Sequence, residues 1–188
     1  MSWSVEDHEL HLLSVLPNGQ SGDAYRAGQV QVTADADGRL LPPWQRWWRP
    51  LSDVVAFAAV CDCTVAPAPA PAGGAVWRTK RTRLARWERV QDPHLEDLCA
   101  GRVYAAGDVS AMDLSDRRDV EEHLLQLWAQ HRAPQEATSA IESAWAHSRN
   151  ALSALDEAVA AGREVGLSWA DIGRATGMTR QSARERWS

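Results

Sequence analysis

The stretch LSWADIGRATGMTRQSARERW, residues 167–187, constrains the fold of this chain more than any other part. It holds two short runs with helical spacing. Ser168 is a good N-cap for the first run, with an acidic residue three positions later, and Thr179 can cap the second. Gly173 is small enough for two helix backbones to cross there, and Gly177 can adopt the positive φ that redirects a chain. The sequence therefore predicts two helices joined by a sharp turn.

The two predicted helices run from Trp169 to Thr176 and from Arg180 to Trp187. In the second helix, Ala183 and Trp187 are one turn apart and are expected to face inward, which leaves a polar face outward. Arginine can donate to O6 and N7 of guanine, glutamine can read adenine, and a capped helix N-terminus can hold a phosphate. The residues expected to contact DNA are Ser168, Thr179, Arg180, Gln181, Ser182, Arg184 and Glu185.

The segment LDEAVAAGREVGLSWADIGRATGMTRQSARERW, residues 155–187, resembles a recurrent C-terminal DNA-binding module of actinobacterial proteins, related to sigma-factor region-4-like and LuxR-like helix-turn-helices. Thr176 departs from the pattern, in which a larger aliphatic residue is usual. The resemblance implies a helix-turn-helix at 168–187 with the recognition helix, 180–187, in the major groove of DNA. The residues that carry it are Ser168-Trp169, Ile172-Gly173, Gly177 to Gln181, Ala183 and Arg186-Trp187.

These features predict a sequence-specific DNA-binding protein, most simply a transcriptional regulator. Four alternatives stay open. The two helices could form a hairpin that only packs or dimerises, or the chain could be a protein-interaction module that docks on polymerase or another regulator. It could also be a plasmid or phage maintenance protein that assembles on repeated DNA sites, or a sensor whose N-terminal domain binds a small molecule.

The charge distribution limits where DNA could bind. Nineteen of the twenty basic residues are arginine and the net charge is −5, which argues against a protein that coats DNA with its whole surface. Residues 163–188, in contrast, carry five basic and three acidic groups. Any DNA-facing surface is therefore expected to be local.

The chain is expected to have an α+β fold, with three parts: a small Trp-rich α+β domain (1–110), a connector helix (111–134) and a helical DNA-binding domain (135–188). Within the first part, 29–33 has the composition of a strand and 37–38 that of a turn. Residues 53–63 also have the composition and length of a strand, although periodicity leaves a short buried helix open. Residues 64–74 read as a Pro/Ala-rich loop. Residues 75–90 are expected to begin as a strand and turn into a helix.

Two longer helices are expected in the second half. The first spans 114–134, with Ser115 as its N-cap and Pro134 as its end, and the second spans about 135–162. A single helix-turn-helix buries little DNA surface, so we expect a homodimer. It would form through the faces that run from Val120 to Trp128 and from Ile141 to Val159, with DNA half-sites about 34 Å apart.

The three cysteines are too few for a disulfide framework. Cys61 and Cys63, with His94 and Cys99, could form a zinc site, but buried thiols without a ligand are the preferred interpretation, and no other cofactor is expected. The aromatic stretch PPWQRWWRP, residues 42–50, could be a stacking surface, although a core plug is more usual.

The densest basic cluster is VWRTKRTRLARW, residues 76–87. It could track DNA phosphates, or it could be a solvated edge strand that faces acidic neighbours such as Glu121 and Glu122. The residues considered for phosphate contacts are Arg78, Lys80, Arg81, Arg83 and Arg174.

The sequence shows no glycine-rich phosphate loop, nucleophile elbow or paired metal-ligand histidines, and we therefore predict that the protein is not an enzyme. No apolar run has the length of a membrane span, and the N-terminus MSWSVEDHEL is acidic rather than signal-like. A cytoplasmic location is the resulting expectation.

Overall fold

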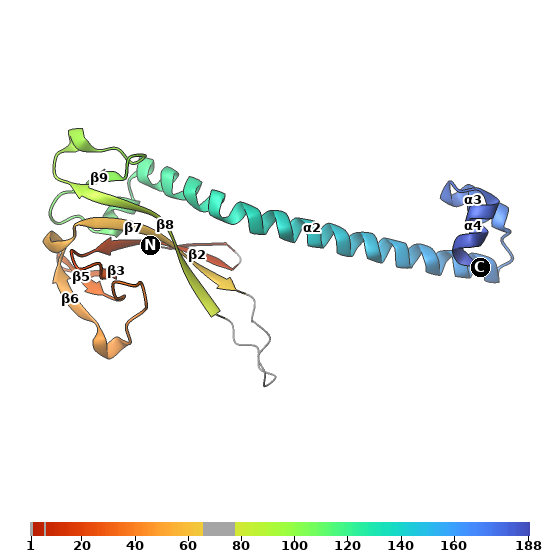
Figure 1. Ribbon diagram of the computed structural model, residues 1–188, viewed down its shortest axis with the longest axis horizontal. Coiled ribbons are helices and arrows are strands. Elements are labelled where there is room, and N and C mark those ends of the chain that lie inside the picture. The colour runs from red at the N-terminus through yellow and green to blue at the C-terminus, as the bar shows by residue number, and fades with distance from the viewer. Residues whose placement is uncertain (1, 6, 66–77) are drawn as a thin grey trace. The chain divides into compact units, whose positions relative to one another are not determined.

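A computed structural model describes residues 2–5, 7–65 and 78–188 of the chain (Figure 1). Contacts between Cα atoms divide it into two units, Met1–Ala133 and Pro134–Ser188, and each is treated separately below. Most of the predicted Pro/Ala-rich loop at 64–74 lies outside the described residues. The fold is α+β, as predicted, with strands in the first unit and helices in the second.

The first unit contains two antiparallel sheets, and one parallel strand completes the larger of them. The larger sheet has the order β1-β2-β7-β8-β9, with β3 paired to β2, and β9 is parallel to β8. Its strands are β1 Ser2–Val5, β2 His8–Val15, β3 Ser21–Gly22, β7 Ala56–Val65, β8 Arg78–Val90 and β9 Arg102–Tyr104. The smaller sheet contains β4 Ala24–Arg26, β5 Gln29–Val32 and β6 Trp47–Pro50. The connections contain the short 3-10 helices η1 Pro43–Gln45, η2 Leu51–Asp53 and η3 Pro93–Leu95.

The predicted strands at 29–33 and 53–63 are confirmed as β5 and β7. Strand β7 lies between β2 and β8, and its residues from Ala56 to Cys61 are all buried, which explains the continuous apolar run. The predicted change from strand to helix within 75–90 is wrong. Strand β8 stays extended because it pairs with β7 from Arg78 to Glu88, with an irregularity in the register opposite Ala59 and Val60.

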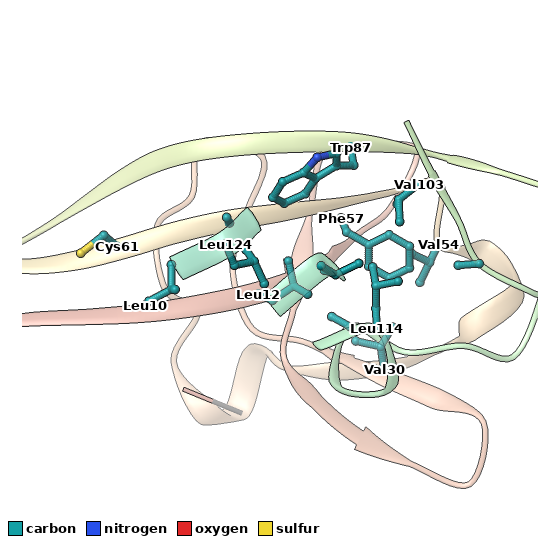
Figure 2. Packing of buried hydrophobic residues seen from close by; sticks show 14 of the residues in the cluster. Leu10, Leu12, Val30, Val54, Phe57, Cys61, Trp87, Val103, Leu114 and Leu124 are labelled. Atoms are coloured by element: carbon teal, nitrogen blue, oxygen red, sulfur yellow. The ribbon is translucent and has the colours of Figure 1, made fainter. Parts of the chain in front are cut away.

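The core of the first unit is formed by both sheets, the helix α1 (Ala111–Ser115) and the beginning of the helix α2 (Arg118–Glu164). Figure 2 shows the rings of Phe57 and Trp87 among aliphatic side chains, and the Trp87 indole N–H donates to the carbonyl of Leu98 over 2.9 Å. From α2, Val120, Leu124 and Trp128 are buried in the same core. The prediction that the Val120–Trp128 face forms a dimer contact is therefore wrong, because the protein's own sheet covers that face.

Gly22 allows β3 to approach β5 of the other sheet. A β-carbon at this position would lie 1.8 Å from the carbonyl oxygen of Gln31, closer than any non-bonded contact permits. A glycine in a strand often marks such an approach between two backbones. The two sheets therefore cross at a point that only a residue without a side chain can occupy.

The predicted helix boundaries between 110 and 134 are wrong. Ser110, not Ser115, is an N-cap, and it begins the short helix α1, Ala111–Ser115. Helix α2 extends from Arg118 to Glu164 and includes Pro134, which was expected to end it. The segment 111–134, which the sequence suggests as a connector, falls within the first unit except for its last residue.

The tryptophans of 42–50 do not plug the core. Trp44 is 82% exposed and Trp47 is also exposed, while the guanidinium of Arg26 lies 4.0 Å from the ring centroid of Trp48. This segment therefore presents aromatic rings at the surface of the first unit.

The second unit comprises the rest of α2 with α3, Trp169–Thr176, and α4, Arg180–Trp187. Val159, Ile172 and Ala183 form its buried core, one residue from each helix. Leu155, Trp169 and Trp187 pack around them, partly buried. Among the described residues, no helix combines the length and the apolar character needed to cross a membrane.

Candidate functional site

The caps of α3 and α4 set the geometry of the C-terminal helices. The Ser168 hydroxyl accepts from the backbone N–H of Asp171 over 3.3 Å, and the Asp171 carboxylate accepts from the backbone N–H of Ser168 over 3.2 Å. The hydrogen bonds from Ser168 hold the pKa of Asp171 below its ordinary value. Thr179 accepts from the backbone N–H of Ser182 over 3.1 Å. Both predicted N-caps are confirmed.

Two glycines fix the turn between α3 and α4. Gly177 ends α3 with φ of +69°, the left-handed conformation predicted for it. A β-carbon on Gly173 would lie 2.8 Å from the carbonyl oxygen of Met178, so the crossing requires glycine there, also as predicted. The backbone N–H of Met178 donates to the carbonyl of Gly173 over 2.8 Å and closes the turn.

One face of α4 is anchored to the rest of the second unit. Ala183 is fully buried, and the Trp187 indole N–H donates to the carboxylate of Asp156 on α2 over 2.7 Å. The guanidinium of Arg186 lies over the Trp187 ring, 4.8 Å from its centroid. The inward orientation predicted for Ala183 and Trp187 is confirmed, and it determines which face of α4 points away.

The other positions of α4 around Ala183 and Trp187 are exposed and polar. Its outward residues are Arg180, Gln181, Ser182, Arg184 and Glu185. Gln181 donates to Glu185 over 2.9 Å. Among the residues that the structure describes, the guanidinium groups of Arg180 and Arg184 have no ion-pair partner, so both are open to an external acceptor.

Several of the other residues predicted to contact DNA already have partners within the protein. Ser168 donates its hydroxyl to Asp171 over 2.6 Å, and Arg174 lies 3.3 Å from the same carboxylate. On β8, Arg81 forms a two-point pair with Asp62, at 2.7 and 2.6 Å, which raises the pKa of Arg81. Lys80 and Arg83 are exposed on this strand.

The basic cluster on β8 partly matches the edge-strand interpretation. Among the described strands, β8 pairs with β9 only between Glu88 and Val90, so the stretch from Arg78 to Trp87 has only β7 as a neighbour. The backbone of Arg78 begins the strand, but its side chain lies outside the described residues. This cluster belongs to the first unit and α4 to the second, so the two basic surfaces are separate candidates.

Of the four residues considered for a zinc site, the structure brings together only the two cysteines of β7. Cys61 and Cys63 lie with their sulfur atoms 3.6 Å apart, but His94 and Cys99 do not join them. Strand β8 carries the chain from Lys80, which pairs with Cys63, to Glu88, which pairs with Ala56 at the far end of β7. His94 and Cys99 follow only after that point.

Two histidines complete the group instead. His8 and His131 join the two cysteines in the one cluster of possible metal ligands among the described residues, with all four ligand atoms within 4.8 Å of one another. Burial lowers the pKa of His131, with smaller contributions from His8 and Lys80, and burial raises the pKa of the Cys61 thiol to about 11. The His131 ring is turned toward the sheet, where its Nε2 lies 3.2 Å from the Cys63 sulfur.

The sequence contained one signal for this cluster. His131 lies on the same predicted apolar face as Leu124 and Trp128, so its orientation toward the core could have been expected. His8 begins an alternating strand, but nothing in the sequence near it indicates a ligand, because its position opposite Cys63 depends on strand pairing. Comparisons with protein-family models, with curated proteins and with solved structures find no match to this chain.

Proposed function

We propose that this chain is a sequence-specific DNA-binding protein, acting as a transcriptional regulator, in which α3 and α4 form a helix-turn-helix. In this proposal α3 supports and α4 enters the major groove. The observation that carries it is the two-sided character of α4. One side is fixed by Ala183 and Trp187, and the other presents unpaired guanidinium groups beside a capped N-terminus.

The roles of individual residues follow from their chemistry. Arg180 and Arg184 are one turn apart and would donate to O6 and N7 of guanine, while Gln181 would read adenine. The first N–H groups of α4, next to Thr179, would hold a backbone phosphate. Each two-point contact between an arginine and a guanine is worth about 1–3 kcal/mol of discrimination. A protein that regulates transcription in a bacterium would work in the cytoplasm.

A single α4 would bind weakly, so the proposal includes a homodimer. The part of α2 in the second unit carries exposed apolar residues on one face, with Ile141 70% and Trp145 63% exposed. Ile141, Trp145, Ser148 and Leu152 alternate four and three residues apart. This spacing is that of a coiled-coil seam, which a second copy of the same helix complements.

The test begins by selecting bound sequences from a random pool of DNA with the purified full chain. The selected site is then used in gel-shift titrations at fixed salt with the double variant Arg180→Ala/Arg184→Ala. We expect the preference for the selected site over random DNA to disappear, with at least about a fivefold loss of affinity for each contact removed. Phosphate contacts would leave some non-specific binding.

The matched control is the double variant Arg39→Ala/Arg118→Ala, which removes the same charge from two strongly exposed arginines of the first unit. It should keep the sequence preference. If the α4 double variant also keeps it, α4 is not the recognition helix and the proposal fails. Footprints that spread over tandem arrays would instead favour a maintenance protein that assembles on repeated sites.

A further inference from the structure

The first unit contains a cluster of two thiols and two imidazoles that the proposed DNA-binding function does not use. We propose that His8, Cys61, Cys63 and His131 form a structural zinc site with a Cys2His2 ligand set. This inference is independent of the DNA-binding proposal, because all four residues lie in Met1–Ala133.

The distances in the cluster match the edges of a zinc tetrahedron. Zn–S bonds of about 2.3 Å and Zn–N bonds of about 2.0–2.1 Å give edges of about 3.8 Å between two sulfurs and about 3.5 Å between sulfur and nitrogen. The Cys61 and Cys63 sulfurs lie 3.6 Å apart. His8 Nδ1 lies 3.4 Å from the Cys61 sulfur, and His131 Nε2 lies 3.2 Å from the Cys63 sulfur. These three contacts are close to those edges, and all four ligand atoms lie within 4.8 Å of one another, so small side-chain rotations would bring them around one ion.

Three elements bring the ligands together. Cys61 and Cys63 are two residues apart on β7, so both side chains lie on one face of the sheet. His8 pairs directly with Cys63 in the neighbouring strand β2. His131 comes from α2, one turn after the buried Trp128, and its ring meets that of His8 at 86° with centroids 5.4 Å apart. The ligands are thus held by the same packing that forms the core.

The surroundings also suit a metal-bound thiolate. The indole N–H of Trp128 points at the Cys61 sulfur over 3.4 Å. A buried indole donor needs an acceptor, and a thiolate is a far better acceptor than a thiol. Such second-sphere donors are usual around metal-bound cysteine. Two thiolates and two neutral imidazoles balance the charge of Zn²⁺, so the loaded site would be neutral and could stay buried.

The ligand types select the class of metal. Thiolate and imidazole favour zinc and other soft or borderline ions, whereas calcium and magnesium require oxygen ligands, which this set lacks. With four protein ligands the site would have no open position, which is typical of structural zinc. The metal would join the beginning of α2 to β2 and β7, and its removal should lower the stability of the first unit.

The test measures metal in the full chain, purified without a histidine tag and with zinc in the medium. We expect inductively coupled plasma mass spectrometry to find about one zinc ion per chain. After zinc is removed, Co²⁺ should give the intense visible bands of tetrahedral cobalt and a thiolate charge-transfer band. A chelator should lower the thermal midpoint of the protein.

The variants Cys63→Ser and His131→Gln should bind less than a tenth of the zinc of the wild type. The matched controls are Cys99→Ser and His94→Gln, which remove the same groups elsewhere in the first unit, and both should keep their zinc. Far-UV circular dichroism checks that each variant is folded. If the ligand variants do not fold, the Co²⁺ spectrum of the wild type decides the question, because it reports thiolate ligation directly.

Three results would overturn the proposal. The first is a wild-type chain that contains no zinc and gives no thiolate band with Co²⁺. The second is loss of zinc in Cys99→Ser or His94→Gln with retention in His131→Gln, which would assign the metal to other ligands. The third is a Cys61–Cys63 disulfide in freshly purified protein that contains no metal.

Discussion

At the scale of single residues, most local signals could be predicted, although Ser115 is not the N-cap it was expected to be, and long-range partners could not. The caps at Ser168 and Thr179 and the turn at Gly177 were predictable because each depends on only a few neighbouring residues. The pair between Arg81 and Asp62 was not, because it depends on the register of two strands. His8 could not be predicted as a possible ligand for the same reason, because its position opposite Cys63 also depends on strand pairing.

Gly173 offers a sharp prediction, because two effects of its replacement have opposite signs. In an ordinary helix, Gly→Ala is stabilising by about 1 kcal/mol. In α3 the new β-carbon would press on the Met178 carbonyl, 2.8 Å away, and would force α3 and α4 apart. We expect Gly173→Ala to lower the thermal midpoint, to weaken protection from hydrogen exchange in 169–187 and to reduce DNA binding.

The control for that variant is Gly107→Ala, where a β-carbon would meet nothing within 4 Å. It should leave exchange in 169–187 unchanged. A Gly173→Ala protein as stable as the wild type would show that α3 and α4 do not cross as closely as described.

At the scale of elements, the sequence predicted the types of most helices and strands but misplaced several boundaries. Pro134 lacks the N–H that a helix needs and disfavours helical backbone in the residue before it, so a helix end was the reasonable prediction. Helix α2 nevertheless includes it, and the Thr138 hydroxyl donates to its carbonyl over 2.9 Å. In β8, pairing with β7 overrides the helix-like spacing of Leu84 and Trp87.

The capping box of α1 makes folding stability depend on pH. The Asp113 carboxylate accepts from the backbone N–H and the hydroxyl of Ser110, over 2.8 and 2.6 Å, and these bonds lower the pKa of Asp113. Because the pKa of Asp113 is lowered in the folded state, the cap makes its full contribution to folding stability at pH values above the ordinary carboxyl pKa. That contribution is lost as the pH falls through the lowered value.

We therefore expect Asp113→Asn to be less stable than the wild type at neutral pH by about 0.5–1 kcal/mol, the lower half of the usual range because the carboxylate is exposed and screened. The difference should close as the pH falls below the ordinary carboxyl pKa. Urea denaturation at a series of pH values measures it, with Asp37→Asn as the control for loss of an exposed charge. A difference that stays constant at every pH would contradict the assigned role of the carboxylate.

At the scale of the whole molecule, the α+β class was predictable from the contrast between the strand-rich beginning and the helical end. The partner of each apolar helix face was harder to predict, because periodicity shows that a face is buried but not which part of the molecule, or which other molecule, covers it. Val120, Leu124 and Trp128 pack on their own sheet, whereas Ile141 and Trp145 remain exposed. The predicted dimer face from Val120 to Trp128 was thus wrong. The face from Ile141 to Val159 was wrong at its Val159 end, which packs in the second unit's own core, and stays a prediction for its exposed part.

The remaining face leads to a test of oligomeric state. Light scattering at micromolar concentration should give the mass of a dimer for the wild type and of a monomer for Trp145→Glu, since a carboxylate in the seam would be buried without a partner. The control Ser143→Glu places the same charge on a different face of the helix. The Trp145→Glu variant should also bind the selected DNA at least tenfold more weakly. A wild-type monomer, both alone and with DNA, would rule out this seam.

The crossing of the two sheets at Gly22 has a consequence for how such a sequence can vary in evolution. The Gln31 carbonyl occupies the space where any β-carbon at Gly22 would be placed, so even alanine is excluded. Most surface positions can drift freely, but lineages that keep this crossing must keep glycine there. A glycine two positions before β4, the strand that contains Tyr25, and followed by the alternating QVQV of β5 would therefore help to identify sequences of common descent.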